Sequence, residues 1–145
     1  MYSNVHAFTG LAITTSIYAV TKSEPLAFAI GLPLAVISHY FIDYLFEKGL
    51  SKKEVFVYDI LPCFLYVALA FFSGHFWLFI LSWWAGNLFD LIDKKMYLAI
   101  FFPSKYKVTN YLHNHKKGIR FTLQQTKIAS IVSSVLILTI FLILN

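Results

Sequence analysis

Long apolar runs alternate with short polar stretches along the chain and divide it into five candidate helices. The apolar runs cover residues 5–20, 25–46, 55–72, 75–92 and 128–144. Because a membrane-spanning helix needs about 20 predominantly apolar residues, several of these runs are short, and we expect a thin or tilted bundle. The stretch 96–102 is stopped by Pro103 and is too short to cross. We expect it to lie in the membrane interface or to re-enter.

The composition supports a membrane environment. The chain is 59% hydrophobic and only 13% charged, whereas soluble domains carry about 25% charged residues. We therefore predict an all-α protein: a polytopic membrane helix bundle of about five transmembrane helices plus a short interfacial segment. Residues 1–145 are expected to form one domain. The first residues lack a basic stretch, so we expect no cleaved signal peptide.

The basic residues predict an orientation. If the five segments alternate across the membrane, only Lys22 lies on one side, and all other basic residues lie on the opposite side. Positive residues favour the cytoplasmic side. We therefore expect a multi-pass protein of the inner (plasma) membrane with a cytoplasmic amino terminus and an external carboxyl terminus. The net charge of +5 then indicates contact with the lipid bilayer and its anionic phospholipid headgroups rather than with nucleic acid.

Ionisable residues inside the apolar runs are the candidate functional groups. His39 and Asp43 are four residues apart, which places both on one face of a helix. Under the predicted topology, further polar residues collect at the same depth as this pair, near the cytoplasmic side. They are His6, Asp59, Asn87, Asp90, Asp93, His113 and His115.

Histidine with carboxylate is a ligand set typical of zinc, manganese or iron. We therefore predict a divalent metal, with Zn favoured over Mn or Fe, held by His6, His39, Asp43, Asp90, His113 and His115. Asp59 would be a further ligand or a catalytic carboxylate that orients a histidine. Taken singly, these residues have plainer explanations. His39 and Asp43 can form a hydrogen-bonded pair within one helix, and Asp93 before Lys94 reads as a solvated charge at the membrane edge.

The order of these motifs resembles a family of small bacterial inner-membrane proteins described as predicted membrane-bound metal-dependent hydrolases. The matching elements are His6-Ala-Phe-Thr-Gly10, Ser38-His-Tyr-Phe-Ile-Asp43, Gly86-Asn-Leu-Phe-Asp-Leu-Ile-Asp93 and His113-Asn-His115. The second element is also similar to a metal-ligand helix of zinc-dependent phospholipases C and single-strand nucleases. Two departures are Tyr44-Leu45 after Asp43 and Lys116-Lys117-Gly118 after the histidine pair.

The resemblance implies a membrane-embedded metal-dependent hydrolase, and the depth of the site favours a phosphoester carried by a lipid. Lys116, Lys117, Arg120 and Asn87 are then candidates for binding the substrate phosphate. The alternative is a protein without catalytic activity, either a cation-binding or transport bundle or an accessory subunit of a larger assembly. The sequence leaves open whether the chain forms a homo-oligomer.

Overall fold

The computed structural model describes residues 3–45, 51–93, 95, 98–107, 109 and 122–145, and its regular elements are all helices. The long helices are α1 (Ser3–Thr21), α2 (Glu24–Leu45), α4 (Leu61–Phe72), α5 (Phe76–Gly86) and α8 (Leu123–Leu144). The short elements are α3 (Lys52–Val55), the π-helical turn η1 (Phe56–Ile60), α6 (Leu88–Asp93) and α7 (Leu98–Phe101). The prediction of an all-α bundle is confirmed for these residues.

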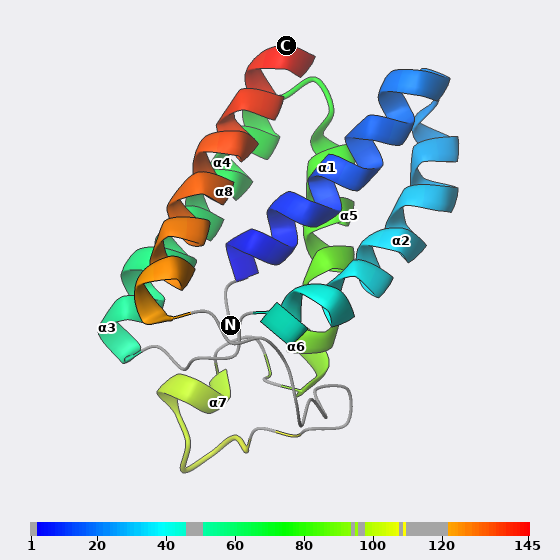
Figure 1. Ribbon diagram of the computed structural model, residues 1–145. Coiled ribbons are helices and arrows are strands. Elements are labelled where there is room, and N and C mark those ends of the chain that lie inside the picture. Colours follow the sequence, from blue (N-terminus) through cyan, green and yellow to red (C-terminus); the bar gives the residue numbers. More distant parts are fainter. Residues whose placement is uncertain (1–2, 46–50, 94, 96–97, 108, 110–121) are drawn as a thin grey trace.

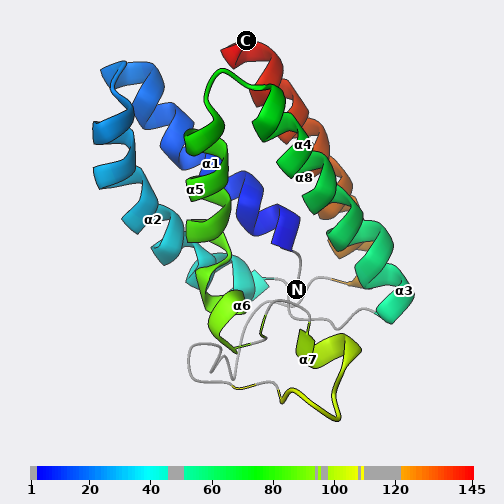
Figure 2. The ribbon, with the colours of Figure 1, turned by 180° about the vertical axis from the view of Figure 1, so that it is seen from behind.

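Helix α1 is the central element of the bundle. It packs against α2, α5 and α8, and Figures 1 and 2 show it crossing between α2 and the α4–α8 pair. Gly10 and Gly86 let α1 and α5 approach until their backbones touch. A Cβ at Gly10 would lie 2.5 Å from the carbonyl oxygen of Ser82, and a Cβ at Gly86 would lie 2.3 Å from that of His6.

Within the part of the chain that the structure describes, three segments are long and apolar enough to cross a membrane, fewer than the five predicted. They are Glu24–Asp43, Lys52–Phe72 and Leu123–Leu144. Helix α1 differs because threonine, serine, asparagine and histidine make up much of it, and several of these side chains are buried in the bundle. The apolar segment 75–92 is also not one long helix, because α5 has 11 residues and ends before Asn87.

Large apolar side chains cover the outside of the spanning helices. Phe71 and Phe72 of α4 and Leu142 and Ile143 of α8 are more than 60% exposed. Such a surface needs an apolar surrounding. Length, composition and surface therefore agree that these helices suit a bilayer.

The segment of α3, η1 and α4 runs on through Pro62. In the π-helical turn the Leu61 N–H donates to the Phe56 carbonyl five residues earlier, and Pro62 has no N–H to continue this pattern. The hydroxyl of Ser130 on α8 donates a hydrogen bond to the Tyr58 carbonyl of the same turn. Thus a polar contact joins α8 to η1 at the end of the bundle where α1 begins.

Candidate metal centre

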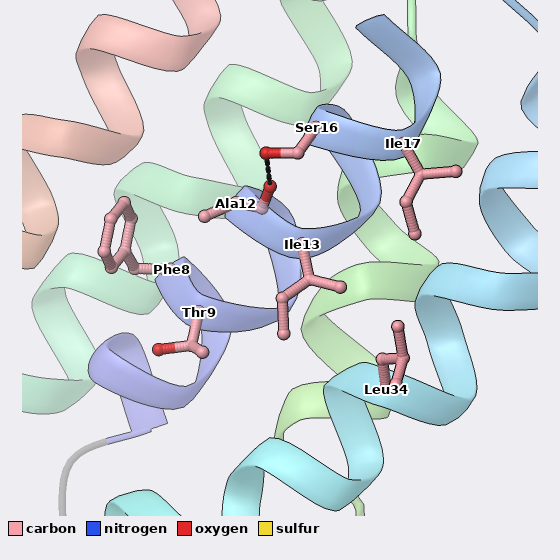
Figure 3. Close-up of a pocket in the computed structure, with 7 residues that line it drawn as sticks. All are labelled: Phe8, Thr9, Ala12, Ile13, Ser16, Ile17 and Leu34. Carbon is pink, nitrogen blue, oxygen red and sulfur yellow. Dashed lines mark hydrogen bonds between the residues drawn. The ribbon is translucent and has the colours of Figure 1, made fainter. Parts of the chain in front are cut away.

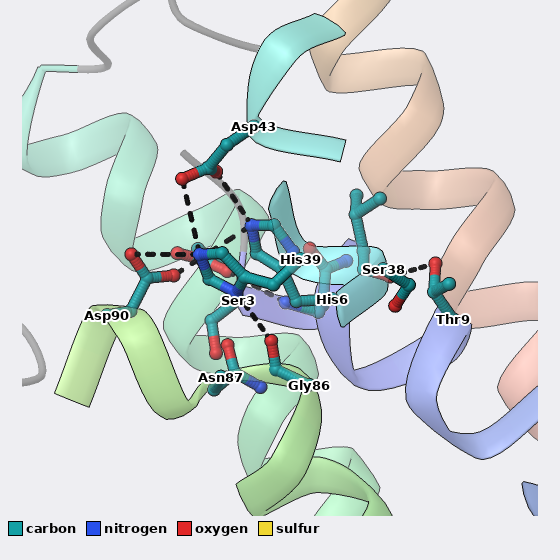
Figure 4. Close-up of polar contacts among 12 residues, drawn as sticks. Ser3, His6, Thr9, Ser38, His39, Asp43, Gly86, Asn87 and Asp90 are labelled. Atoms are coloured by element: carbon teal, nitrogen blue, oxygen red, sulfur yellow. Dashed lines mark hydrogen bonds and ion pairs between the residues drawn. The ribbon is translucent and has the colours of Figure 1, made fainter. Parts of the chain in front are cut away.

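Four side chains from three helices meet beside the first turns of α1. His6 comes from α1, His39 and Asp43 from α2, and Asp90 from α6. Figure 4 shows the two carboxylates turned toward the two imidazole rings. All four residues are buried, with exposures between 0% and 4%. The predicted convergence of these four residues is therefore present in the structure.

Asp43 and Asp90 each approach both histidines. The Oδ1 atom of Asp43 lies 3.0 Å from Nε2 of His6, and its Oδ2 atom lies 3.2 Å from Nε2 of His39. The Asp90 carboxylate lies 3.9 Å from each of the same two nitrogens. Both Nε2 atoms thus face the same small volume between the carboxylates.

The imidazole rings of His6 and His39 are stacked. Their centroids lie 3.8 Å apart and their planes differ by 10°. Two imidazolium cations in that position would repel each other strongly in a buried site. The stack therefore disfavours charging both rings at once, and neutral imidazole is the form that ligates metals.

The backbone of α5 sets the tautomer of His39. The Nδ1–H group of His39 donates a hydrogen bond of 2.6 Å to the carbonyl oxygen of Gly86. Because a carbonyl oxygen only accepts, Nδ1 carries a proton, and neutral His39 presents an unprotonated Nε2 toward Asp43. Metal-ligating histidines commonly use their second nitrogen in this way.

The donor set and its spacing fit a divalent metal. Ligand atoms of His6, His39 and Asp43 all lie within 4.8 Å of one another. Zinc binds nitrogen and oxygen ligands at about 2.1 Å with tetrahedral geometry, so its ligand atoms lie roughly 3.4 Å apart. The distances from the carboxylates to the nitrogens, 3.0–3.9 Å, bracket that value. His6, His39 and Asp43 can therefore hold a metal ion, with Asp90 beside them, and nothing in the structure identifies the metal.

Asp59 of η1 has its carboxylate beside the first turn of α1. Its Oδ1 atom accepts a hydrogen bond of 3.1 Å from the backbone N–H of Asn4. The amide of Asn4 in turn donates to the carbonyl and hydroxyl oxygens of Ser130 on α8. Asp59 is 1% exposed. Its hydrogen bond to Asn4 thus holds the first turn of α1, just before His6.

Asp93 differs from its sequence-based interpretation, whereas the part of Asn87 in binding substrate stays a prediction. The Asn87 amide group donates to the Trp83 carbonyl of its own helix at 2.9 Å, so this donor is engaged within the fold. Asp93 is fully buried, and its carboxylate accepts a 3.0 Å hydrogen bond from the hydroxyl of Thr109. The prediction that Asp93 is a solvated charge is therefore wrong, because the chain after α6 returns to cover it.

The remaining predicted residues belong to the segment 110–121. His113, His115, Lys116, Lys117 and Arg120 lie outside the described residues. Their parts as metal ligands or phosphate contacts stay predictions.

Sequence reasoning missed the role of Gly86. Its carbonyl fixes His39, and its missing side chain makes room for the backbone of His6. The only signal was its place four residues before Asp90.

No protein-family model, curated protein or solved structure matches this chain. The geometry of the centre is therefore the main support for a function.

Proposed function

We propose that this chain is a membrane-embedded, metal-dependent hydrolase that acts on a phosphoester, with a lipid as the favoured carrier. His6, His39, Asp43 and Asp90 would hold the metal, with zinc favoured by the mixed nitrogen and oxygen ligands. The observation that carries the proposal is the meeting of two buried carboxylates with two stacked, buried imidazole rings. The similarity to membrane-bound hydrolases supplies the reaction class.

Each described residue would have a defined part in the reaction. A bound divalent cation would supply a Lewis acid for a phosphoryl oxygen and lower the pKa of a bound water toward about 7. His39 would keep its Nε2 directed into the site through the bond to Gly86. Asp59 would act as a positioning residue, because it holds the backbone at Asn4, two residues before His6. Lys116, Lys117 and Arg120 would bind the substrate phosphate.

The basic residues support a location of the site on the cytoplasmic side of an inner membrane. We propose that the end of the bundle with His6 and Asp43 faces the cytoplasm, and that the end with Lys22 and Gly74 faces outside.

Metal content tests the first part of the proposal. Protein purified without chelators should hold about one zinc, manganese or iron ion per chain. His39→Ala and Asp43→Ala should lose it, because each removes a ligand atom from the group. His75→Ala is the control, since His75 pairs with Glu24 at the other end of the bundle. Elemental analysis of the four proteins is the measurement, and an empty wild type after zinc addition would refute the centre.

Hydrolysis tests the second part. Wild-type protein in vesicles should release phosphate from phosphatidic acid, and His39→Ala should lose more than the roughly 10–100-fold that changes outside the ligand shell cost. His75→Ala should keep wild-type turnover. A metal-loaded wild type that releases no phosphate from lipid or soluble phosphoesters would contradict the hydrolase.

The alternative is a metal centre without catalysis, in a cation-binding or transport bundle or an accessory subunit. One observation favours it: all four centre residues are at most 4% exposed. A buried ion would then join α1, α2 and α6 as a structural link. Metal bound in wild type, without any phosphoester hydrolysis, is the result that this alternative predicts.

A further inference from the structure

An open groove runs along α1 away from the metal centre. It is lined by six residues of α1 between Phe8 and Ile17 and by Leu34 of α2, and its cavity volume is ≈ 420 Å³. Figure 3 shows these side chains on α1 and on the neighbouring turn of α2. No charged side chain lines it.

The polar groups of this groove are already satisfied within α1. The hydroxyl of Thr9 donates to the carbonyl of Val5 at 2.9 Å, and that of Ser16 donates to the carbonyl of Ala12 at 2.7 Å. Neither hydroxyl needs to donate to an occupant. The groove therefore suits an apolar occupant although two of its residues are polar.

The groove and the centre share helix α1. Phe8 and Thr9 follow His6 by two and three residues, so the groove begins within one turn of the centre. From Phe8 to Ile17 the helix rises about 14 Å at 1.5 Å per residue. This length is close to half of the ~30 Å hydrocarbon core of a bilayer. The length of the groove is thus comparable to that of a lipid chain in one leaflet.

We propose that this groove holds one hydrocarbon chain of the lipid phosphoester whose headgroup lies at the metal centre. The inference rests on the proposed function and specifies its substrate as a membrane lipid with a long chain. Because a lipid chain already lies in an apolar medium, the groove gains little affinity from the hydrophobic effect. Its effect is to place the headgroup beside His6.

A helix of a second copy is the competing occupant of this open groove. The oligomeric state of Ala12→Trp distinguishes it from a lipid chain.

Photocrosslinking in phosphatidylcholine vesicles tests the proposal without measuring turnover. The probe is phosphatidic acid with a diazirine in one acyl chain, added with zinc. Ala12→Trp fills the groove, and Ala19→Trp places the same side chain at an exposed site of α1 outside it. After irradiation, peptides covering 8–17 should carry adducts in wild type and Ala19→Trp. Ala12→Trp should lower them about tenfold while keeping its metal.

Two further comparisons separate this groove from ordinary lipid contact. Asp43→Asn should lower the adducts on 8–17 several-fold, because the lipid headgroup then loses its contact with the metal centre. Unchanged adducts in that variant, or in Ala12→Trp, would overturn the proposal. A dimer of wild type that Ala12→Trp dissociates would also overturn it and assign the groove to a second copy.

The two proposals fail differently. If Ala12→Trp hydrolyses phosphatidic acid as fast as wild type, the groove is refuted while the hydrolase stands. A tenfold loss on phosphatidic acid, with hydrolysis of p-nitrophenyl phosphate unchanged, supports the groove. A wild type that hydrolyses neither compound refutes the proposed function, and with it the substrate inferred from it.

Discussion

Gly86 connects α5 to both histidines of the centre at once. Its carbonyl accepts the Nδ1–H of His39, and its Cα lies against the backbone of His6. We expect Gly86→Ala to push α5 away from α1, because the new Cβ would lie 2.3 Å from the His6 carbonyl oxygen. Zinc affinity should fall about 10–100-fold, as for other groups that orient a ligand. Competition with a zinc indicator measures this change.

Gly10→Ala is the matched control for this substitution. Its Cβ would lie 2.5 Å from the Ser82 carbonyl, so it forces apart the same helix pair about one turn further from the centre. Both variants should be less stable to heat, whereas only Gly86→Ala should lose most of its zinc affinity. Equal losses of affinity would show that general loosening of α1 and α5, and not Gly86, is responsible.

At the residue scale, the sequence predicted side chains better than backbone groups. The spacing of His39 and Asp43 predicted a shared helix face, and depth added His6 and Asp90. The Gly86 carbonyl was not predictable, because every residue has a carbonyl and only the fold shows which one meets His39. Asp93 was misread for a related reason: its partner Thr109 lies beyond α6, and no local pattern joins the two.

At the scale of elements, Ser130 connects α8 to two other segments. Its hydroxyl donates to the Tyr58 carbonyl and accepts a hydrogen bond from the Asn4 amide. We expect Ser130→Ala to lower the free energy of unfolding by about 1–2 kcal/mol, because it removes the donor to the part-buried Tyr58 carbonyl and an acceptor of the buried Asn4 amide. Unfolding in detergent, followed by circular dichroism, measures the loss.

Thr139→Val provides the comparison on the same helix. The hydroxyl of Thr139 is exposed and donates only to the carbonyl of Val135, four residues earlier in α8. Its removal should change the free energy of unfolding by less than about 0.5 kcal/mol. If both variants lose the same stability, the contact of Ser130 with Tyr58 and Asn4 contributes nothing specific.

The boundaries and surroundings of helices were predictable where polarity changes sharply along the chain. They were unpredictable where contacts between helices determine which residues are buried. The apolar run 128–144 became α8, whose start is fixed by the Thr122 side chain capping Gln125. The run 5–20 became α1, yet several of its polar residues are buried in the bundle and it lacks the hydropathy of a span. A hydrophobic run alone cannot tell a lipid-facing helix from one enclosed by its neighbours.

At the scale of the whole molecule, the two ends of the bundle differ in chemistry. One end holds the buried histidines and carboxylates, and the other holds the His75–Glu24 pair and the turn at Gly74. We expect Gly74→Cys and Lys52→Cys, at opposite ends of one spanning segment, to react on opposite sides of the membrane.

An impermeant maleimide should label Gly74→Cys on intact cells and Lys52→Cys only after permeabilisation, each in a Cys63→Ala background. Cys63 is buried, so the unsubstituted chain serves as the unlabelled control. Labelling of both positions from one side would contradict the predicted crossing. Labelling of Lys52→Cys alone on intact cells would reverse the orientation.

The centre draws its ligands from helices that leave the ribosome at very different times. His6 is translated before α2, and Asp90 only after α5. All four ligands are thus present only after α1, α2 and α6 have been made. If these residues hold a metal as proposed, loading is expected late in biogenesis, after the helices enter the bilayer. Cells starved of the metal would accumulate inserted chains in which the start of α1 is not held to α2 and α6. Such chains are expected substrates of membrane proteases.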